Sequence, residues 1–551
     1  MELKDMSADN AYMGSRKVPK RSRKPLFLTL FLVLLAGAGA GGVWHVQKQI
    51  EAEVAAAIAQ AGGSAQSISF SFFDKNLKLK DVRLTPEGGD LRSITAEYAE
   101  LDGFDASCLR KAKRGALPAR VMNYFKAEGI QIDGGYGEDL SFHEKLQSVQ
   151  AEKLKANVGT LLDIYSHERF SPAFFDEVKN CELERAVFKN AETVYQAEGE
   201  SVRVTVEESR ILNWVRDIFD IETQNASVEM KEESMRCESA AFSGFAIPES
   251  GFLAALIPGS RASGQVESYV KKALNGGESL SDLLRLYETV FGDRPVWQKL
   301  EVRNCELRVK EVPDIRIARI FNEQERERDT HFYGFSVDDV SVAKDGIKKA
   351  AGVEYAEKIE KWLPGGLHAS WSGRTGYAPS TGDYTAKTHF SMPNIGACDT
   401  SYEVVLPAQE LVRLLDEEKW DSVFNKTSLK KLSLKWDDKG LIRLLLELYA
   451  EENGKSLEST VRELRDGLTQ AIEMGQALLL SQADKDFVNQ LGDAARVMLE
   501  QPGTVEAMFE AEKPVPLSAF GKKLRLIPQD CSASVAVTSG NVKLLKEADG
   551  E

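Results

Sequence analysis

The chain repeats one pattern of apolar and polar residues that is typical of half-buried β-strands. Apolar residues follow one another at spacings of two, three and two, and Asp or Asn lies close to the longer step. Alternation puts apolar side chains on one face of a strand, and a single slip of phase suits a β-bulge or a tight bend between paired strands. Full copies run through Leu77, Leu79, Val82 and Leu84 around Asp81, through Leu300, Val302, Cys305, Leu307 and Val309 around Asn304, and through Phe335, Val337, Val340 and Val342 around Asp338 and Asp339.

Shorter copies of the same pattern occur at 178–183 and at 429–434. The string Asn-Cys-Glu-Leu appears twice, at Asn180–Leu183 and at Asn304–Leu307. The repetition favours internal duplication, and chance similarity between amphipathic strands is the alternative. A further strand-rich block is predicted for 367–406.

Helices are predicted between and after these strands. Apolar residues at spacings of three or four indicate helices over 212–221, 280–291 and 347–362. In the C-terminal third the same spacing predicts helices over 441–449, over 457–472 with Ser456 as the N-cap, and over 487–499. Strands return at 505–509, 524–527 and 532–537. The predicted fold class is α+β, with mostly antiparallel sheets and packed helices.

The first fifty residues predict a membrane anchor. No Asp, Glu, Lys or Arg occurs from Leu26 to Val46, and about 20 apolar residues match the thickness of a bilayer. The apolar side chains expected in the span are Leu26, Phe27, Leu30, Phe31, Leu34 and Leu35, with Trp44 at its outer interface. The basic residues that precede the span, and that should keep the N-terminus cytoplasmic, are Arg16, Lys17, Lys20, Arg21, Arg23 and Lys24.

A cleaved signal peptide is the alternative to an anchor, because small residues at 36–40 offer cleavage sites. Both interpretations export the large domain. Gly37 and Gly41 have the spacing that lets two membrane helices approach closely, which would allow a homodimer. Simple tolerance of glycine in the span is the competing interpretation.

The predicted organisation follows from these segments. Residues 1–24 form a cytoplasmic basic tail, 25–46 the transmembrane anchor and 47–63 a stalk helix. Residues 64–366 form a strand-rich exported region with internal repeats and intervening helices. Residues 367–540 form a second sheet with a helical C-terminal region, and 541–551 form a polar tail.

The net charge excludes one class of partner. The whole chain carries −15, and residues 1–24 hold seven Lys and Arg against three Asp and Glu, so the remainder carries −19. Such a body repels polyanions, and its most basic run, at 110–114, is interpreted as a solvated turn. No nucleic-acid partner is predicted.

The sequence contains no recognisable catalytic, cofactor or metal motif. None of the six histidines lies two to five residues from another, and no glycine-rich phosphate loop or Gly-x-Ser-x-Gly elbow occurs. We therefore predict no catalytic, cofactor-binding or metal-binding residues. The six cysteines are widely spaced, so an oxidising compartment would allow up to three disulfides in 15 connectivities, and burial as small apolar residues is the alternative.

The strand motif Ser69–Leu84 with its later echoes, together with the basic flank and the single span, resembles the AsmA-like group of inner-membrane-anchored, periplasmic proteins of proteobacteria. The segment 432–441, with 501–504 and 513–517, resembles uncharacterised anchored envelope proteins. The AsmA-like resemblance implies envelope assembly or lipid movement along a long curved sheet with an apolar groove. The frequent predicted helices depart from that picture and put a continuous groove in doubt.

The leading hypothesis from the sequence is a non-enzymatic protein of the inner membrane, with its bulk in the periplasm, that handles lipid or stabilises envelope assembly. A scaffold that binds another envelope protein through its sheet edges or C-terminal helices is the alternative. A hydrolase without a recognisable motif is the third hypothesis.

Overall fold

The computed structural model describes most of the chain after the predicted anchor. It describes residues 43–539 except 60–61, 86–90, 104–118, 137–139, 157–180, 198–199, 217, 247–296, 311, 353–360, 408–409, 411–413, 415–418, 480, 521–525 and 529–530. The predicted basic tail, most of the anchor, the polar tail and the predicted helix at 280–291 lie outside the described residues.

A helix at 43–59 opens the described chain and is followed mainly by strands. The first half contains β1 (Gly63–Ser71), β2 (Asn76–Leu84), β3 (Leu91–Asp102), β4 (Ala119–Arg120), β5 (Tyr124–Tyr136), β6 (Leu140–Glu152), β7 (Lys155–Ala156), β8 (Glu182–Ala197), β9 (Glu200–Val215), β10 (Ile218–Glu229) and β11 (Glu233–Ala246). The second half contains β12 (Lys299–Val309), β13 (Ile315–Glu327), β14 (Thr330–Val342), α8 (Lys344–Ala351), β15 (Leu367–Ala378), β16 (Asp383–Met392), β17 (Gly396–Val405), α11 (Trp420–Lys426), β18 (Ser428–Asp438), α12 (Leu441–Glu452), α13 (Leu457–Leu478), α14 (Gln482–Glu500), β19 (Gly503–Pro516), η1 (Leu517–Ala519) and β20 (Cys531–Ser539).

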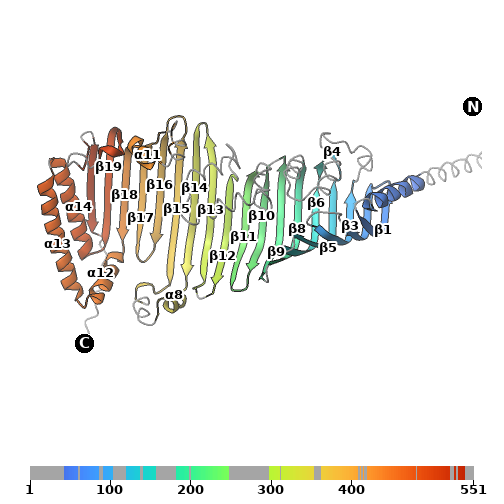
Figure 1. Ribbon diagram of the computed structural model, residues 1–551, viewed down its shortest axis with the longest axis horizontal. Coiled ribbons are helices and arrows are strands. Elements are labelled where there is room, and N and C mark those ends of the chain that lie inside the picture. Colours follow the sequence, from blue (N-terminus) through green and yellow to red (C-terminus); the bar gives the residue numbers. More distant parts are fainter. Residues whose placement is uncertain are drawn as a thin grey trace, which may run out of the picture.

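The strands form one 20-stranded sheet. Each long strand pairs antiparallel with the next long strand along the chain, from β1 through β20. The short strands β4 and β7 pair with each other, and β7 also pairs with β8. Figure 1 shows the result as a long, twisted ribbon of strands, with the helix 43–59 at one end and α13 and α14 at the other.

The register places the apolar residues of successive strands on one face, which we call the apolar face. Residues directly opposite one another in antiparallel strands share a face. Val302 lies opposite Ile320, Ile320 opposite Val337, and Val337 opposite Trp371. The same row continues through Phe390, Cys398, Trp436, Val505 and Val537. The other face, which we call the polar face, carries residues such as Glu301, Arg303, Arg319 and Asp338.

Neighbouring strands make the three-residue step of the pattern together, so the register between them is kept: Cys237 and Ser239 lie opposite Cys305 and Arg303. The residue at the step has a positive φ in several strands: 48° at Asp81, 48° at Asn190, 49° at Asn225, 50° at Asn304 and 48° at Asp339. Asn and Asp tolerate this left-handed conformation better than other non-glycine residues. Each of the three asparagines also donates its side-chain amide to the neighbouring strand, and the acceptors are Gln147, Glu207 and Glu238 respectively.

A helix covers each of the two free edges of the sheet. At β1, Gln47 Nε2 donates to Phe70 O at 2.8 Å and Phe70 N donates to Glu51 Oε1 at 3.1 Å. At β20, Val535 N donates to Gln490 Oε1 of α14 at 2.8 Å. Exposed edge strands invite pairing with other chains, and these contacts occupy backbone groups that would otherwise be available.

The helix predicted as a stalk is present and packs on the sheet. Ile50 and Val54 belong to the same buried cluster as Phe70 and Leu77 of the first two strands. Its apolar spacing of four residues is therefore explained by burial against the apolar face. The sequence anticipated the helix but not its partner.

Several predicted elements differ in the structure. Residues 367–540 do not form a second sheet, because β15–β20 continue the first. The helix predicted at 212–221 is the β9–β10 hairpin. A β-bulge at Asn213, whose φ is 53°, and a turn at Arg216, whose φ is 61°, bring two strand patterns into apparent helical spacing. The strand predicted at 524–527 is wrong at 526–527, where both backbone N–H groups donate to Asp484.

The predicted C-terminal helices are confirmed. They correspond to α12, α13 and α14, and the Ser456 side chain accepts from Ser459 N at 3.1 Å as the N-cap of α13. The helix predicted over 347–362 is confirmed only at its start, because α8 ends before Gly352, whose φ is 83°, and 353–360 lie outside the described residues.

Asn304→Ala should destabilise the protein, because the left-handed conformation costs an alanine roughly 1–2 kcal/mol and the hydrogen bond to Glu238 is lost. Asn304→Gly is the matched control, since glycine adopts positive φ freely and loses only the hydrogen bond. Thermal unfolding of the full-length protein in detergent measures both. A melting temperature for the alanine variant equal to or above that of the glycine variant would contradict this role for the left-handed residue.

Candidate functional site

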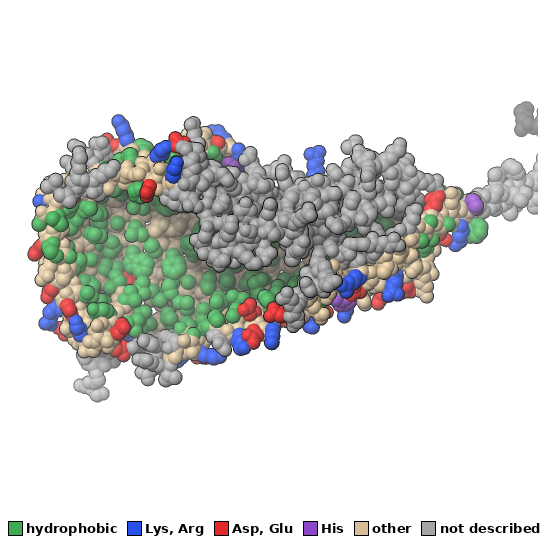
Figure 2. Space-filling model, in the orientation of Figure 1, with side chains coloured by type: hydrophobic (Ala, Val, Ile, Leu, Met, Phe, Trp, Pro, Cys, Tyr) green, Lys and Arg blue, Asp and Glu red, His purple; other side chains and the backbone are tan. Residues whose placement is uncertain are grey.

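The apolar face is open to solvent over the C-terminal half of the sheet. Trp371 of β15 is 51% exposed and Tyr333 of β14 is 44% exposed, which is unusual for large side chains that line a continuous apolar surface. Figure 2 shows a hollow lined by hydrophobic side chains in this part of the molecule, with charged side chains at its rim. We call this surface the trough and define it by the exposed apolar-face residues Tyr333, Trp371, Phe390, Leu432 and Leu434.

The same face is closed near the N-terminal end of the sheet. Leu77 is only 3% exposed, and the buried cluster around it includes Leu79, Ala99, Ala127, Ile130 and Leu146. The helix 43–59 contributes Ile50 and Val54 to that cluster. The sheet thus buries its apolar face at the end next to the predicted anchor and exposes it toward the other end.

Polar groups on the apolar face bond to one another in several places. Buried Asn322 accepts from Trp297 Nε1 at 2.7 Å and donates to Gly334 O at 3.1 Å. The Thr388 and Thr400 hydroxyls lie 2.5 Å apart in a hydrogen bond. Burial, and then a hydrogen bond with Tyr402, raises the pKa of Tyr384 to about 12, so that hydroxyl stays neutral. These polar side chains are uncharged and hydrogen-bonded within the sheet, so the face keeps its apolar character at these positions.

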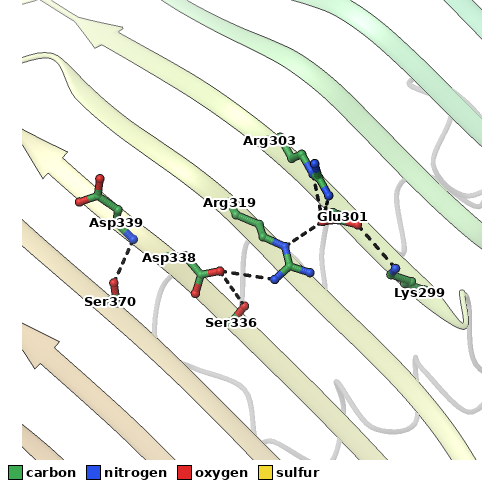
Figure 3. A network of polar contacts seen from close by, with 8 residues as sticks. All are labelled: Lys299, Glu301, Arg303, Arg319, Ser336, Asp338, Asp339 and Ser370. Atoms are coloured by element: carbon green, nitrogen blue, oxygen red, sulfur yellow. Dashed lines mark hydrogen bonds and ion pairs between the residues drawn. The ribbon is translucent and has the colours of Figure 1, made fainter.

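The polar face carries ion-pair networks between strands. Figure 3 shows one, in which Glu301 of β12 lies 2.8 Å from both Arg303 and Arg319, and Arg319 reaches Asp338 of β14 at 3.6 Å. Partial burial raises the pKa of the Glu301 carboxyl, but hydrogen bonds from the two arginines outweigh it and leave the pKa below its usual value. Solvated charge on this face and apolar side chains on the other make the sheet two-sided.

A disulfide joins Cys237 of β11 to Cys305 of β12. The two residues lie directly opposite one another, and along the strands they alternate with the polar pair Arg236 and Glu306, so they lie on the apolar face. The sequence allowed either a disulfide or simple burial for Cys305, and the structure shows the disulfide. Cys181 is buried, and Cys108 lies outside the described residues.

Three histidines pair with aspartates on neighbouring strands of the polar face. The Nδ1-to-Oδ1 distances are 2.6 Å for His143 and Asp133, 2.7 Å for His368 and Asp339, and 2.6 Å for His389 and Asp399. The hydrogen bond to Asp339 raises the pKa of His368. The sequence missed these pairs, because each joins residues ten or more positions apart.

The His389–Asp399 pair has a serine close by, as the catalytic site of a hydrolase would. Ser372 lies directly opposite His389, beside a shallow depression of about 520 Å³. The strands pair continuously around Ser372, so the backbone N–H groups serve the sheet ladders and do not converge on an oxyanion. Among the described residues no group of three or more His, Cys, Asp or Glu side chains could hold a metal ion. The arrangement therefore supports no specific reaction.

The predicted anchor residues fall mainly outside the described chain. This applies to Leu26, Phe27, Leu30, Phe31, Leu34 and Leu35, to the basic residues 16–24, and to Gly37 and Gly41. Trp44 is described, near the start of the helix 43–59, and is exposed. Within the described residues, no helix has the length and apolar character needed to cross a membrane.

Glu301→Gln should lower stability at neutral pH by about 1 kcal/mol, because it removes charge-assisted hydrogen bonds. A carboxyl whose pKa is lowered by folding stabilises the protein above its unfolded-state value of 4.5, and this contribution is lost as the pH falls through the folded-state value. The difference in melting temperature from wild type should therefore shrink as the pH falls below 4.5. Glu403→Gln, exposed on the same face of β17, is the control, and a difference independent of pH would contradict the assignment.

Comparison with known proteins gives a limited result. A family model described as an uncharacterised protein matches residues 389–538, which include β17–β19, α12–α14 and all but the last residue of β20. The match covers under a third of the chain. No curated protein sequence matches the chain.

Proposed function

We propose that the trough holds the acyl chains of lipids, and that the protein handles lipid in the cell envelope as a membrane-anchored, exported protein without enzymatic activity. The observation that carries the proposal is the single apolar face that the register extends across the sheet and leaves open over β14–β18. The anchor predicted for residues 25–46 would tether this face to a membrane by its closed end.

The chemistry of the trough favours acyl chains as its occupant. An acyl chain needs no hydrogen-bond partners, whereas a peptide must satisfy its backbone N–H and C=O groups when it leaves water. Trough residues such as Trp371, Leu432 and Leu434 offer large apolar area. Each square ångström of apolar surface that a ligand removes from water contributes roughly 25 cal/mol.

Two further observations support the proposal, one for export and one against a scaffold that binds through its sheet edges. The Cys237–Cys305 disulfide fits an oxidising compartment outside the cytoplasm, in which either kind of protein would lie. The contacts of Gln47, Glu51 and Gln490 occupy backbone groups on both edge strands, which disfavours strand addition by a partner at those positions. An envelope protein bound in the trough is the competing outcome of the test below.

Trp371→Arg should reduce lipid binding, because it puts a charge in the trough that acyl chains cannot solvate. Cells that express the full-length protein are fed a photoactivatable fatty acid, and the crosslinked peptides are identified by mass spectrometry. We expect crosslinks within 367–392 in the wild-type protein and at least a fivefold loss in the variant.

Ser372→Arg is the matched control for this experiment. It introduces the same side chain one residue away on the same strand but on the opposite face, so lipid crosslinking should persist. Equal crosslinking in both variants, or crosslinks outside the trough only, would contradict the proposal. A crosslinked protein in place of lipid would favour the scaffold.

The disulfide makes a separate prediction about export. Peptide mapping without reduction, on protein alkylated inside intact cells, should recover the peptides of Cys237 and Cys305 linked to each other. A variant that lacks residues 16–46 should stay in the reducing cytoplasm and yield the two peptides alkylated separately. Alkylation of both thiols in the full-length protein would argue against an exported location.

A further inference from the structure

The helix 43–59 and β1 run in opposite directions along each other. Near the end of the helix, Ile58 lies beside Gly63 at the start of β1, since a Cβ on Gly63 would be 3.2 Å from Ile58 Cγ2. Near its start, Gln47 and Glu51 bond to Phe70 at the end of β1. The beginning of the helix therefore points toward the turn that joins β1 to β2.

Trp44 and Phe72 lie on the two sides of the contact between the helix and β1. Trp44 lies about one helical turn before Gln47, and Phe72 lies two residues after Phe70, to which Gln47 bonds. Both residues therefore lie at the end of β1 that leads into the β1–β2 turn.

Three aromatic side chains are exposed at this end of the molecule. Trp44 is 62% exposed, Phe72 41% and Phe73 80%. The Phe72 and Phe73 rings pack edge to face with centroids 5.9 Å apart, and Ser71 Oγ donates to Asp74 Oδ2 at 2.8 Å across the turn. Ring contact and turn hydrogen bond hold the side chains at the tip, where water would otherwise favour their burial.

We propose that Trp44, Phe72 and Phe73 form an aromatic tip that inserts into the interfacial layer of the bilayer that the anchor spans. The predicted span overlaps the start of the helix 43–59, so the tip lies at the membrane surface without any linker. Aromatic rings concentrate at the boundary between lipid headgroups and acyl chains. This proposal rests on the anchor in the proposed function but not on what the trough holds.

The tip gives the sheet a second attachment to the membrane besides the anchor. One helix allows the body to rotate and tilt, whereas a helix plus the β1–β2 turn fixes the first strands against the surface. Because the strands follow one another in chain order, β20 with α13 and α14 is then held at the far end from the bilayer (Figure 1). The open trough would face the space beyond the membrane surface.

A paramagnetic test on the full-length protein measures contact with the bilayer directly. The protein is reconstituted into nanodiscs of phosphatidylethanolamine and phosphatidylglycerol that contain a lipid with a nitroxide on its headgroup. 4-Fluorophenylalanine replaces Phe73 in one sample and Phe424, which is exposed on α11, in the other. We expect the nitroxide to broaden the fluorine signal at position 73 at least threefold more than the signal at position 424.

Each other outcome overturns the proposal in an identifiable way. Little broadening at either position, in protein that is retained in the nanodisc, overturns the tip while leaving the anchor and the lipid proposal in place. Equal broadening at both positions indicates that the body lies flat on the bilayer and also overturns it. Protein that does not enter nanodiscs overturns the anchor and the tip together, whereas the crosslinking test of the trough is independent of all three results.

Discussion

The left-handed step that neighbouring strands share is the constraint on which the rest of the structure depends. A strand with strict alternation and one extra residue would turn half of its apolar side chains to the wrong face, since a slip of one residue exchanges the two faces. The left-handed residues at Asp81, Asn190, Asn225, Asn304 and Asp339 absorb that residue locally, and a paired strand makes the same step, so the register between the two is kept. The apolar face therefore remains continuous from strand to strand.

The edge strands and the apolar face of the sheet are covered to different extents along its length. At the ends, the helix 43–59 and α14 cover the edge strands, which blocks pairing with other chains at Phe70 and Val535. Near β1 and β2 the face itself is buried. Over β14–β18 it stays open, although a soluble protein normally covers such a surface. We interpret that open region as the place where a ligand completes the core.

The sequence predicted much of the strand content, and the reason is physical. The spacing of Leu300, Val302 and Cys305 around Asn304 encodes both the apolar face and the left-handed step in neighbouring residues. Helix caps such as Ser456 are equally local. Three features could not be predicted this way: the joining of β15–β20 to the first sheet, the cysteine pairing, and the open trough. Each depends on which strands lie side by side. The hairpin at 212–221 shows the converse error, where two strands and a turn imitate the spacing of a helix.

The central claim is that acyl chains occupy the trough. The most direct measurement is an experimental density map of the full-length protein extracted with its native lipids. The account predicts elongated, unbranched density along Tyr333, Trp371 and Leu434. An empty trough, or a trough filled by ordered polypeptide, would contradict it.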